Sequence, residues 1–238
     1  MPPRALEPAG IVLLDKPAGP SSFALVAQLR RRTGARTGHA GTLDPFATGL
    51  LVLLSGSATK LAPCFVGLDK RYVTEIDLTA RTATGDPEGA IVERLVPPAR
   101  DELEQRLGRL RGEIELPIPA ASAVKIGGER AYRLARRGIA VEMPVRRSRI
   151  GALTVIAYTE GMVALDLRVS SGTYVRAIAD ALGGHCRTLR RTEVGPFSLG
   201  EADPDTVVPT AVALARLSAE ARSRVSAGVL ARAMGETA

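Results

Sequence analysis

Two patterns of hydrophobic residues recur along the 238-residue chain and predict both strands and helices. Residues 72–79 alternate between apolar and polar side chains, which is typical of a half-buried strand. Residues 22–32 instead place Leu25, Val26 and Leu29 on one side of a helix that Ser21 or Ser22 can cap. Further strands are expected at residues 10–14, 50–54, 90–95, 150–158, 162–170 and 189–199, and further helices at residues 58–66, 100–110, 130–137 and 173–182.

The order of these elements favours an α+β class, because strands and helices are interspersed and several strands form hairpins. We expect a mixed or antiparallel sheet flanked by helices. Residues 1–200 carry all the predicted strands and form one predicted domain. Residues 201–238 are rich in Ala and Arg and are expected to form a short, mostly helical C-terminal segment.

The composition is that of an ordinary globular protein, with 45% hydrophobic and 24% charged residues. Two cysteines are too few for a disulfide framework, and the N-terminal residues lack the apolar core of an export signal. The apolar run at residues 50–54 is far shorter than the ~20 residues that a membrane helix needs. We therefore expect a cytoplasmic protein that is neither secreted nor membrane-spanning.

The charge adds a candidate partner. The net charge is +7, the isoelectric point is near 10, and only four of the 32 basic residues are lysines. Guanidinium groups pair bidentately with phosphate, which favours a nucleic acid as the partner. A GC-rich coding sequence would also favour arginine on any protein surface, so the charge alone leaves both interpretations open.

The densest cluster of chemistry-bearing residues is a glycine-rich loop within residues 38–49. Three glycines permit tight turns or close approach of a ligand, and Pro45 stiffens the chain directly after Asp44. Such a loop is suited to hold one carboxylate in a fixed position, and an aspartate can act as a covalent nucleophile. An isolated Asp-Pro pair is more often a simple turn, so the loop by itself decides little.

The whole string GHAGTLDPFATGLL, residues 38–51, resembles the catalytic motif of the TruB family of tRNA pseudouridine synthases. Similar blocks follow in the family's order over about the first 200 residues. They are LLDKPAGPSS, SGSATKL, DKRYVTEIDL, SAVKIGGERAYRLARRG, SSGTYVRAIADALG and TLRRTEVGPFSL. The resemblance implies a pseudouridine synthase fold and an enzyme that converts uridine 55 in the T-loop of tRNA to pseudouridine without a cofactor.

The resemblance also assigns catalytic roles to three residues. Asp44 matches the nucleophile, and Arg176 matches the arginine that pairs with it. Tyr72 matches the active-site tyrosine that stacks on the target base and takes part in proton removal. An adjacent guanidinium would favour the ionised form of the carboxylate, which suits a nucleophile.

Four further residues match positions that bind the substrate. His39 matches a histidine that contacts the RNA around the flipped base, and Tyr174 matches a substrate-contacting tyrosine. Leu189 matches an apolar residue that lines the uracil pocket, and Lys16 matches a basic residue of the N-terminal motif. Tyrosine and leucine side chains give an unstacked base a stacking face and an apolar wall.

Each of these residues alone has an ordinary structural interpretation, as a loop histidine, a half-buried tyrosine, a surface lysine or a core leucine. The two histidines and two cysteines do not have the spacing of a zinc site, so no metal is expected. Two other functions stay open: a non-catalytic factor that binds or folds tRNA, and a synthase for a different RNA uridine. A monomer is expected.

The chain departs from the family pattern in four places, one of which is a paired proline that is reduced to Pro119-Ala120. Residues 82–84 read Thr-Ala-Thr where the family usually has Thr-Asp-Thr, and Ala121 replaces a frequent tyrosine. Residues 201–238 are too few for the RNA-binding PUA domain of many bacterial members, so that domain is expected to be absent or a remnant. We then expect tRNA affinity to depend on arginines of the catalytic domain, at residues 30–32, 146–147 and 190–191.

Overall fold

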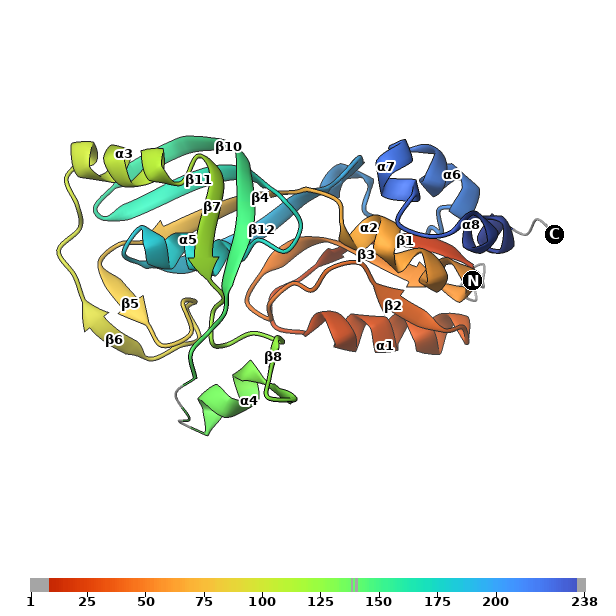
Figure 1. Ribbon diagram of the computed structural model, residues 1–238, viewed down its shortest axis with the longest axis horizontal. Helices are drawn as coiled ribbons and strands as arrows, with labels where there is room; N and C mark the ends of the chain where they lie inside the picture. Colours follow the sequence, from red (N-terminus) through yellow and green to blue (C-terminus); the bar gives the residue numbers. More distant parts are fainter. Residues whose placement is uncertain (1–8, 138, 140, 235–238) are drawn as a thin grey trace. The chain divides into compact units, whose positions relative to one another are not determined.

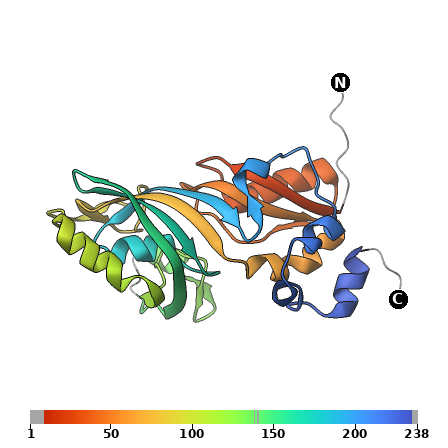
Figure 2. The ribbon, with the colours of Figure 1, turned by 90° about the horizontal axis from the view of Figure 1, so that it is seen from above.

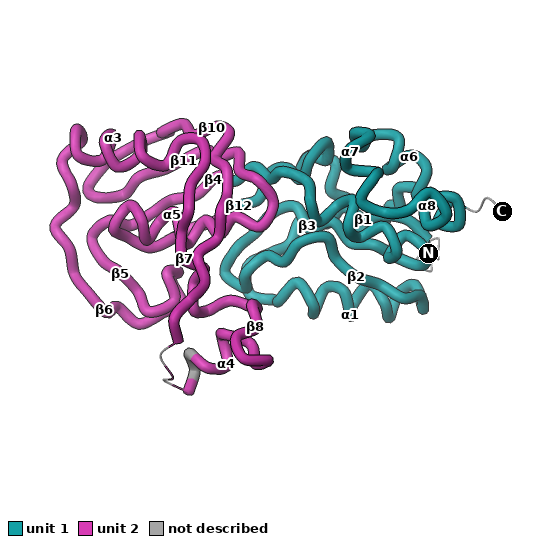
Figure 3. Tube along the Cα trace, in the orientation of Figure 1, with its two compact units in different colours: residues 1–72, 190–238 teal, residues 73–189 magenta. Residues whose placement is uncertain are grey.

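The computed structural model describes residues 9–137, 139 and 141–234. The chain forms two compact units, here called unit 1 (residues 1–72 and 190–238) and unit 2 (residues 73–189), which are coloured separately in Figure 3. Within the described ranges, no helix is long and apolar enough to cross a membrane.

Unit 1 is built around strand β3 (Thr48–Ser55), whose eight residues are almost all buried. Strands β1 (Gly10–Lys16) and β2 (Thr37–His39) both run antiparallel to β3. The C-terminal part of β12 (His185–Val194) runs parallel to it, with Arg190 opposite Thr48. The sheet is therefore mixed, as the sequence predicts.

Successive side chains of β1 and β3 enter two different hydrophobic clusters, because side chains alternate between the two faces of a strand. Val12, Leu51 and Leu53 pack with Leu25, Val26 and Leu29 of helix α1 (Ser22–Thr33). On the other face lie Ile11, Leu13, Leu50, Val52 and Leu54. Figure 2 shows α1 on one side of these strands and the C-terminal helices on the other.

Helix α1 forms where the sequence predicts it and has clear signals at both ends. The side chain of Ser21 accepts a hydrogen bond from the Ala24 amide at 3.2 Å, which caps the N-terminus. Gly34 ends the helix in the left-handed conformation, with φ of 67°. Three arginines in the last turn lie at the negative end of the helix dipole.

The second face of the unit 1 sheet is covered by short helices. Ala213, Leu214, Leu217, Ala221 and Ala233 of the C-terminal segment belong to the same hydrophobic cluster as the β1 and β3 residues named above. The helices that contribute to this layer are η1 (Gly56–Leu61), α2 (Ala62–Val66), α6 (Thr210–Ala215), α7 (Ala219–Arg222) and α8 (Ala227–Met234).

Unit 2 holds the second part of the sheet, in the order β12, β4 (Lys70–Asp77), β11 (Met162–Val169), β10 (Val145–Thr159) and β7 (Gly112–Pro117). Strands β4 and β12 belong partly to each unit, since the boundaries fall within them. The remaining elements of unit 2, seen in Figure 1, are β5 (Ala80–Thr82), β6 (Ile91–Arg94), α3 (Arg100–Arg109), β8 (Lys125–Ile126), β9 (Glu129–Arg130), α4 (Ala131–Arg136) and α5 (Val175–Ala181).

The described elements confirm the α+β class and most of the predicted segments. The predicted helix at residues 58–66 is instead a 3-10 helix followed by a short α-helix, with Pro63 near the start of the latter. The predicted strand at residues 189–199 begins earlier and breaks into β12 and β13 (Phe197–Ser198), because Gly195 turns the chain with φ of 53°. The expected helix end at Gly138 lies outside the described residues.

Candidate active site

Asp44 lies near the middle of a loop, residues 40–47, that connects β2 to β3 in unit 1. Pairing of His39 with Leu53 and a hydrogen bond from the Ala40 amide to the Val52 carbonyl (2.9 Å) close the base of this loop. The Ala47 amide donates to the Asp44 carbonyl at 3.1 Å, which makes a tight turn after Asp44. Asp44 itself is half-buried.

Two buried side chains bind the backbone of this loop. The Ser22 hydroxyl accepts from the Leu43 amide at 2.8 Å and donates to the Leu43 carbonyl at 3.0 Å. The ammonium of Lys16, which is fully buried, donates to the carbonyls of Pro45 (3.0 Å) and Ala47 (2.7 Å). The residues on both sides of Asp44 are thereby fixed, as the stiff Asp-Pro loop of the sequence predicts.

The position of Lys16 bears on its predicted role. Its ammonium also donates to the Pro17 carbonyl at 2.9 Å, so three backbone carbonyls surround it. This geometry makes Lys16 a support of the Asp44 loop. Direct contact of Lys16 with a substrate stays a prediction.

His39 is the last residue of β2 and lies five residues before Asp44. Burial, together with the charge of Arg191, lowers the pKa of its imidazole below the usual value. The His39 Nδ1 atom is buried and has no hydrogen-bond partner within the described part of the chain. The lowered pKa favours the neutral form of this imidazole.

The adjacent arginines at residues 190 and 191 have different environments, and the sequence prediction is wrong for one of them. The Arg191 side chain is almost completely buried and donates to backbone carbonyls, so it is not available to an RNA phosphate. Arg190 is partly exposed and pairs with Asp15 at 2.7 Å. Only Arg190 of this pair can contact RNA.

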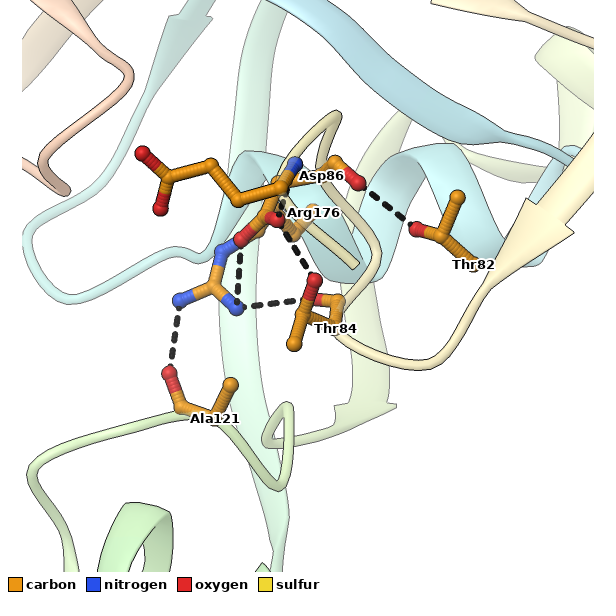
Figure 4. A network of polar contacts seen from close by, with 6 residues as sticks. Thr82, Thr84, Asp86, Ala121 and Arg176 are labelled. Carbon is orange, nitrogen blue, oxygen red and sulfur yellow. Dashed lines mark hydrogen bonds and ion pairs between the residues drawn. The ribbon is translucent and has the colours of Figure 1, made fainter. Parts of the chain in front are cut away.

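In unit 2, Arg176 is held by a polar network that Figure 4 shows in detail. Its guanidinium donates to the carbonyls of Thr84 (2.8 Å) and Ala121 (2.9 Å), and its Nη1 lies 3.7 Å from the Asp86 carboxylate. Arg176 is 3% exposed and Asp86 is 6% exposed. The guanidinium is thus fixed in a largely dry environment, where its charge interacts strongly with any anion brought near it.

Asp86 belongs to this network but is not among the residues that the sequence singles out. Its carboxylate accepts from the Thr84 hydroxyl and from the Glu88 amide (3.1 Å), which orders the turn that carries it. The Gly-Asp-Pro string at residues 85–87 was the only local signal, and the same kind of string forms ordinary turns.

Two departures from the family pattern, Ala121 and the Thr-Ala-Thr string at residues 82–84, leave the hydrogen bonds of this network intact. Arg176 bonds the backbone carbonyls of Thr84 and Ala121, not their side chains. A different side chain at residue 121 leaves that acceptor in place. The Thr-Ala-Thr string likewise keeps both the carbonyl and the hydroxyl of Thr84.

The other predicted residues occupy defined places in their units. Tyr72 is buried on β4 in unit 1. Tyr174 is half-buried at the N-terminus of α5 in unit 2 and lines a small pocket with Arg146 and Ser148, among others. Leu189 is buried on β12 in unit 2.

The seven predicted site residues thus fall into two groups. Lys16 and His39 lie at the two strand ends beside the Asp44 loop, and Tyr72 belongs to the same unit. The second group, Tyr174, Arg176 and Leu189, belongs to unit 2. The pairing of Asp44 with Arg176 stays a prediction.

The site offers no candidate for a metal centre. Among the residues that the structure describes, no three His, Cys, Asp or Glu side chains are grouped so that they could hold a metal ion. Unit 1 provides a carboxylate on a fixed loop, a partly buried imidazole and the buried ring of Tyr72, and unit 2 provides a fixed guanidinium and the buried side chain of Leu189.

Comparison with known proteins identifies the family of this chain. The family model described as TruB family pseudouridylate synthase (N terminal domain) matches residues 29–175. This chain belongs to the TruB family. The TruB match contains the Asp44 loop, Tyr72, Asp86 and Tyr174, and it ends one residue before Arg176.

Curated proteins named tRNA pseudouridine synthase B are similar to most of this chain. A Mycobacterium sp. (strain KMS) protein named tRNA pseudouridine synthase B is 47% identical over 210 residues, which cover 82% of this chain and 70% of that protein. A protein of the same name from Leifsonia xyli subsp. xyli (strain CTCB07) is 42% identical over 222 residues, which cover 87% of this chain and 74% of that protein.

Solved structures support the fold. A crystal structure of a Cbf5-Nop10-Gar1 complex matches this chain with a TM-score of 0.61 and 26% sequence identity. The match covers 79% of this chain and 50% of that chain, so this chain spans half the length of the matched structure.

Proposed function

We propose that this TruB-family protein is a tRNA pseudouridine synthase that isomerises uridine 55 in the T-loop, with Asp44 as its nucleophile. The observation that carries the proposal is the Asp44 loop, in which buried side chains fix the backbone on both sides of one half-buried carboxylate. A protein that only binds RNA has no need of a carboxylate held in this way. The names and identities of the curated relatives support the same reaction and substrate.

The chemistry needs only the groups that this chain supplies. Isomerisation breaks the bond between N1 of uracil and C1′ of ribose and forms a bond from C5 of uracil to the same C1′. The C5 proton is lost and N1 gains one, so the product has the composition of the substrate and no co-reactant is required. Asp44 forms a transient covalent bond with the nucleoside, which divides one difficult step into two easier ones.

The other site residues bind and orient the base. We expect Arg176 to pair with Asp44 and to keep that carboxylate ionised. Tyr72 stacks on the uracil and takes part in removing the C5 proton, while Leu189 forms an apolar wall. His39 and Tyr174 contact the RNA around the target nucleotide, and the neutral state of His39 suits contact with a flat base.

The target base must leave the folded T-loop to reach Asp44. Base flipping costs a few kcal/mol in unstacking and unpairing, and contacts of arginines with RNA phosphates can offset this cost. We infer that residues 1–200 act as the catalytic domain, that residues 201–238 are a mostly helical segment, and that the protein works as a monomer in the cytoplasm without a metal.

The proposal is tested by incubating the protein with T-stem and T-loop transcripts and mapping pseudouridine at single-nucleotide resolution. We expect product at position 55. Asp44→Asn is nearly isosteric and should bind the transcript as before, but its rate should fall by more than about 10³-fold, because the nucleophile is lost.

Two other outcomes would each replace this proposal. Transcript binding without any product would make the protein a non-catalytic tRNA-binding or tRNA-folding factor. Product only at a different uridine would make it a synthase for another RNA site.

A further inference from the structure

The side chain of Arg191 is the largest of the fully buried side chains, with 1% exposure, and it comes from β12, far along the chain from the Asp44 loop. Its Nε donates to the Leu50 carbonyl at 2.7 Å. Its Nη2 donates to the Gly41 carbonyl at 3.0 Å, and its Nη1 lies 3.5 Å from the Thr42 carbonyl. The planar guanidinium group, whose donors spread like a fork, thus joins the first residues of the loop to strand β3.

Together with the contacts of Ser22 and Lys16, these bonds hold the backbone along the Asp44 loop. Arg191 binds the carbonyls of residues 41 and 42, Ser22 binds residue 43, and Lys16 binds residues 45 and 47. Among these three side chains, Arg191 is the one that acts on the side of the loop before Leu43. Without it, the carbonyls of Gly41 and Thr42 would lose these side-chain contacts, and only the Ser22 bonds to Leu43 would restrain the chain just before Asp44 among these contacts.

The partners of Arg191 are unusual for so deeply buried a charge. Within the described part of the chain, no carboxylate lies at ion-pair distance from its guanidinium, and the hydrogen bonds go to backbone carbonyls. Burying a guanidinium without an opposite charge is costly, so a role in packing alone would be served better by an apolar side chain. The planar fork, with donors in fixed directions, is what orients several carbonyls at once.

We propose that Arg191 is a positioning residue for Asp44, which sets the direction of the carboxylate through the carbonyls of Gly41 and Thr42. This inference rests on the proposed function. It assigns to Arg191 a role in the rate of the chemical step and none in binding RNA. A displacement of about 1 Å at a reacting group can cost 10²-fold in rate, so the loss of this fork should reduce turnover markedly.

The test uses two variants that differ in charge. Arg191→Lys keeps the charge but replaces the fork with a single donor group, whereas Arg191→Met keeps much of the volume and removes both. We expect single-turnover rates at saturating protein to fall about 10- to 100-fold in both variants. The dissociation constant for a T-loop transcript should stay within about twofold of the wild-type value.

Leu217→Ala serves as the matched control for stability. Leu217 is buried in the unit 1 core and belongs to the C-terminal segment, so its truncation destabilises the unit while Arg191, Ser22 and Lys16 keep their hydrogen bonds to the Asp44 loop. At a temperature where all variants are folded, this control should keep the wild-type single-turnover rate. Wild-type rates in both Arg191 variants, or equal rate losses in Leu217→Ala, would overturn the proposal.

A further measurement separates this proposal from the proposed function and does not need an active enzyme. Hydrogen exchange of the Leu43 and Ala47 amides reports the order of the loop, because these amides bond the Ser22 hydroxyl and the Asp44 carbonyl. We expect faster exchange at both amides in Arg191→Lys and unchanged exchange in Leu217→Ala. Unchanged exchange in Arg191→Lys would refute the positioning role.

If the wild type makes no pseudouridine while the exchange result is as expected, only the proposed function fails. If neither Arg191 variant folds, exchange of the Arg191 Nε proton is measured in the wild type. Slow exchange would support the hydrogen bonds of this guanidinium to the backbone carbonyls, and fast exchange would refute them.

Discussion

The three glycines around Asp44 differ in whether the structure requires glycine at their positions. Gly41 and Gly49 have φ values of 110° and 101°, which side chains of L-residues rarely allow. Gly38 lies in strand β2 with ordinary backbone angles, and a Cβ there would meet no atom within 4 Å. The sequence marks all three as permissive positions, but the structure requires glycine at only two of them.

Gly49→Ala should destabilise the protein strongly. A Cβ at this position would lie 2.2 Å from the Arg191 carbonyl oxygen, and this backbone cannot move away without breaking the pairing of β3 with β12. We expect a loss of roughly 2–4 kcal/mol in the free energy of unfolding, measured by urea denaturation.

Gly38→Ala is the matched control for this prediction. Its free energy of unfolding should stay within about 0.5 kcal/mol of the wild-type value. Equal losses in the two variants would show that the close approach at Gly49 is not what requires glycine.

Lys70, the first residue of β4, makes stability depend on pH. Burial, followed by the charge of Arg191, lowers the pKa of its ammonium to about 7 from an ordinary value of 10.5. Between these two values the unfolded chain holds the proton and the folded protein does not. The free energy of unfolding should therefore rise with pH from about 7 towards 10.5, by up to about 1.4 kcal/mol per pH unit from this group.

Urea denaturation at several pH values from 6 to 9.5 tests this dependence. The Lys70→Met variant should lose the rise, while Lys60→Met should keep it, because Lys60 is exposed and its variant leaves the Lys70 site intact. An unchanged rise in Lys70→Met would assign the dependence to another group.

Elements were predicted well where a local pattern dominates and less well where a distant partner decides. Helix α1 has its own cap, apolar face and terminal glycine, so the sequence predicts it to within about a residue. Strand β2 has only three residues in a glycine-rich stretch and exists because β3 supplies its hydrogen-bond partners. Nothing in residues 37–39 alone reveals that pairing.

The C-terminal helices illustrate the same point. Residues 201–238 were predicted as a separate helical segment, and helices α6, α7 and α8 do form there. Their apolar side chains belong to the unit 1 core cluster, together with residues of β1 and β3. The segment therefore contributes to the stability of the unit that carries Asp44.

Two substitutions on helix α6 test this contribution. Leu214 is 3% exposed within the core cluster, so Leu214→Ala should lower the free energy of unfolding by about 2–4 kcal/mol. Val212 on the same helix is 53% exposed, so Val212→Ala should change it by less than about 0.5 kcal/mol. Similar small effects in both variants would show that α6 does not belong to the cooperative core.

At the scale of the whole molecule, the excess of arginine divides between structure and surface. Arg191 and Arg176 are buried and bond backbone carbonyls. Arg32 pairs with Asp205. Arg30 and Arg31 are exposed in the last turn of α1, where they can meet RNA phosphates. Only part of the +7 net charge is therefore carried by groups that can bind a polyanion.

Binding of a T-loop transcript should weaken steeply with salt, because contacts with phosphates release counterions. We expect the logarithm of the affinity to fall linearly with the logarithm of the salt concentration. Arg31→Ala should reduce the slope by about 1, whereas Arg31→Lys, which keeps the charge, should leave it unchanged. A flat dependence in the wild type would contradict an affinity dominated by phosphate contacts.

The sequence by itself determined the α+β class, the family and the carboxylate at Asp44, because hydrophobic periodicity and contiguous motifs are local properties of the chain. Only the tertiary structure decided which buried groups hold that carboxylate and its candidate partners. Lys16, Ser22 and Arg191 bind the loop from three separate segments, and Asp86 and Ala121 bind Arg176 from two others. Apart from the ion pair of Asp86 with Arg176, these contacts join residues up to 150 positions apart through backbone carbonyls, which every residue type has, so no sequence pattern records them.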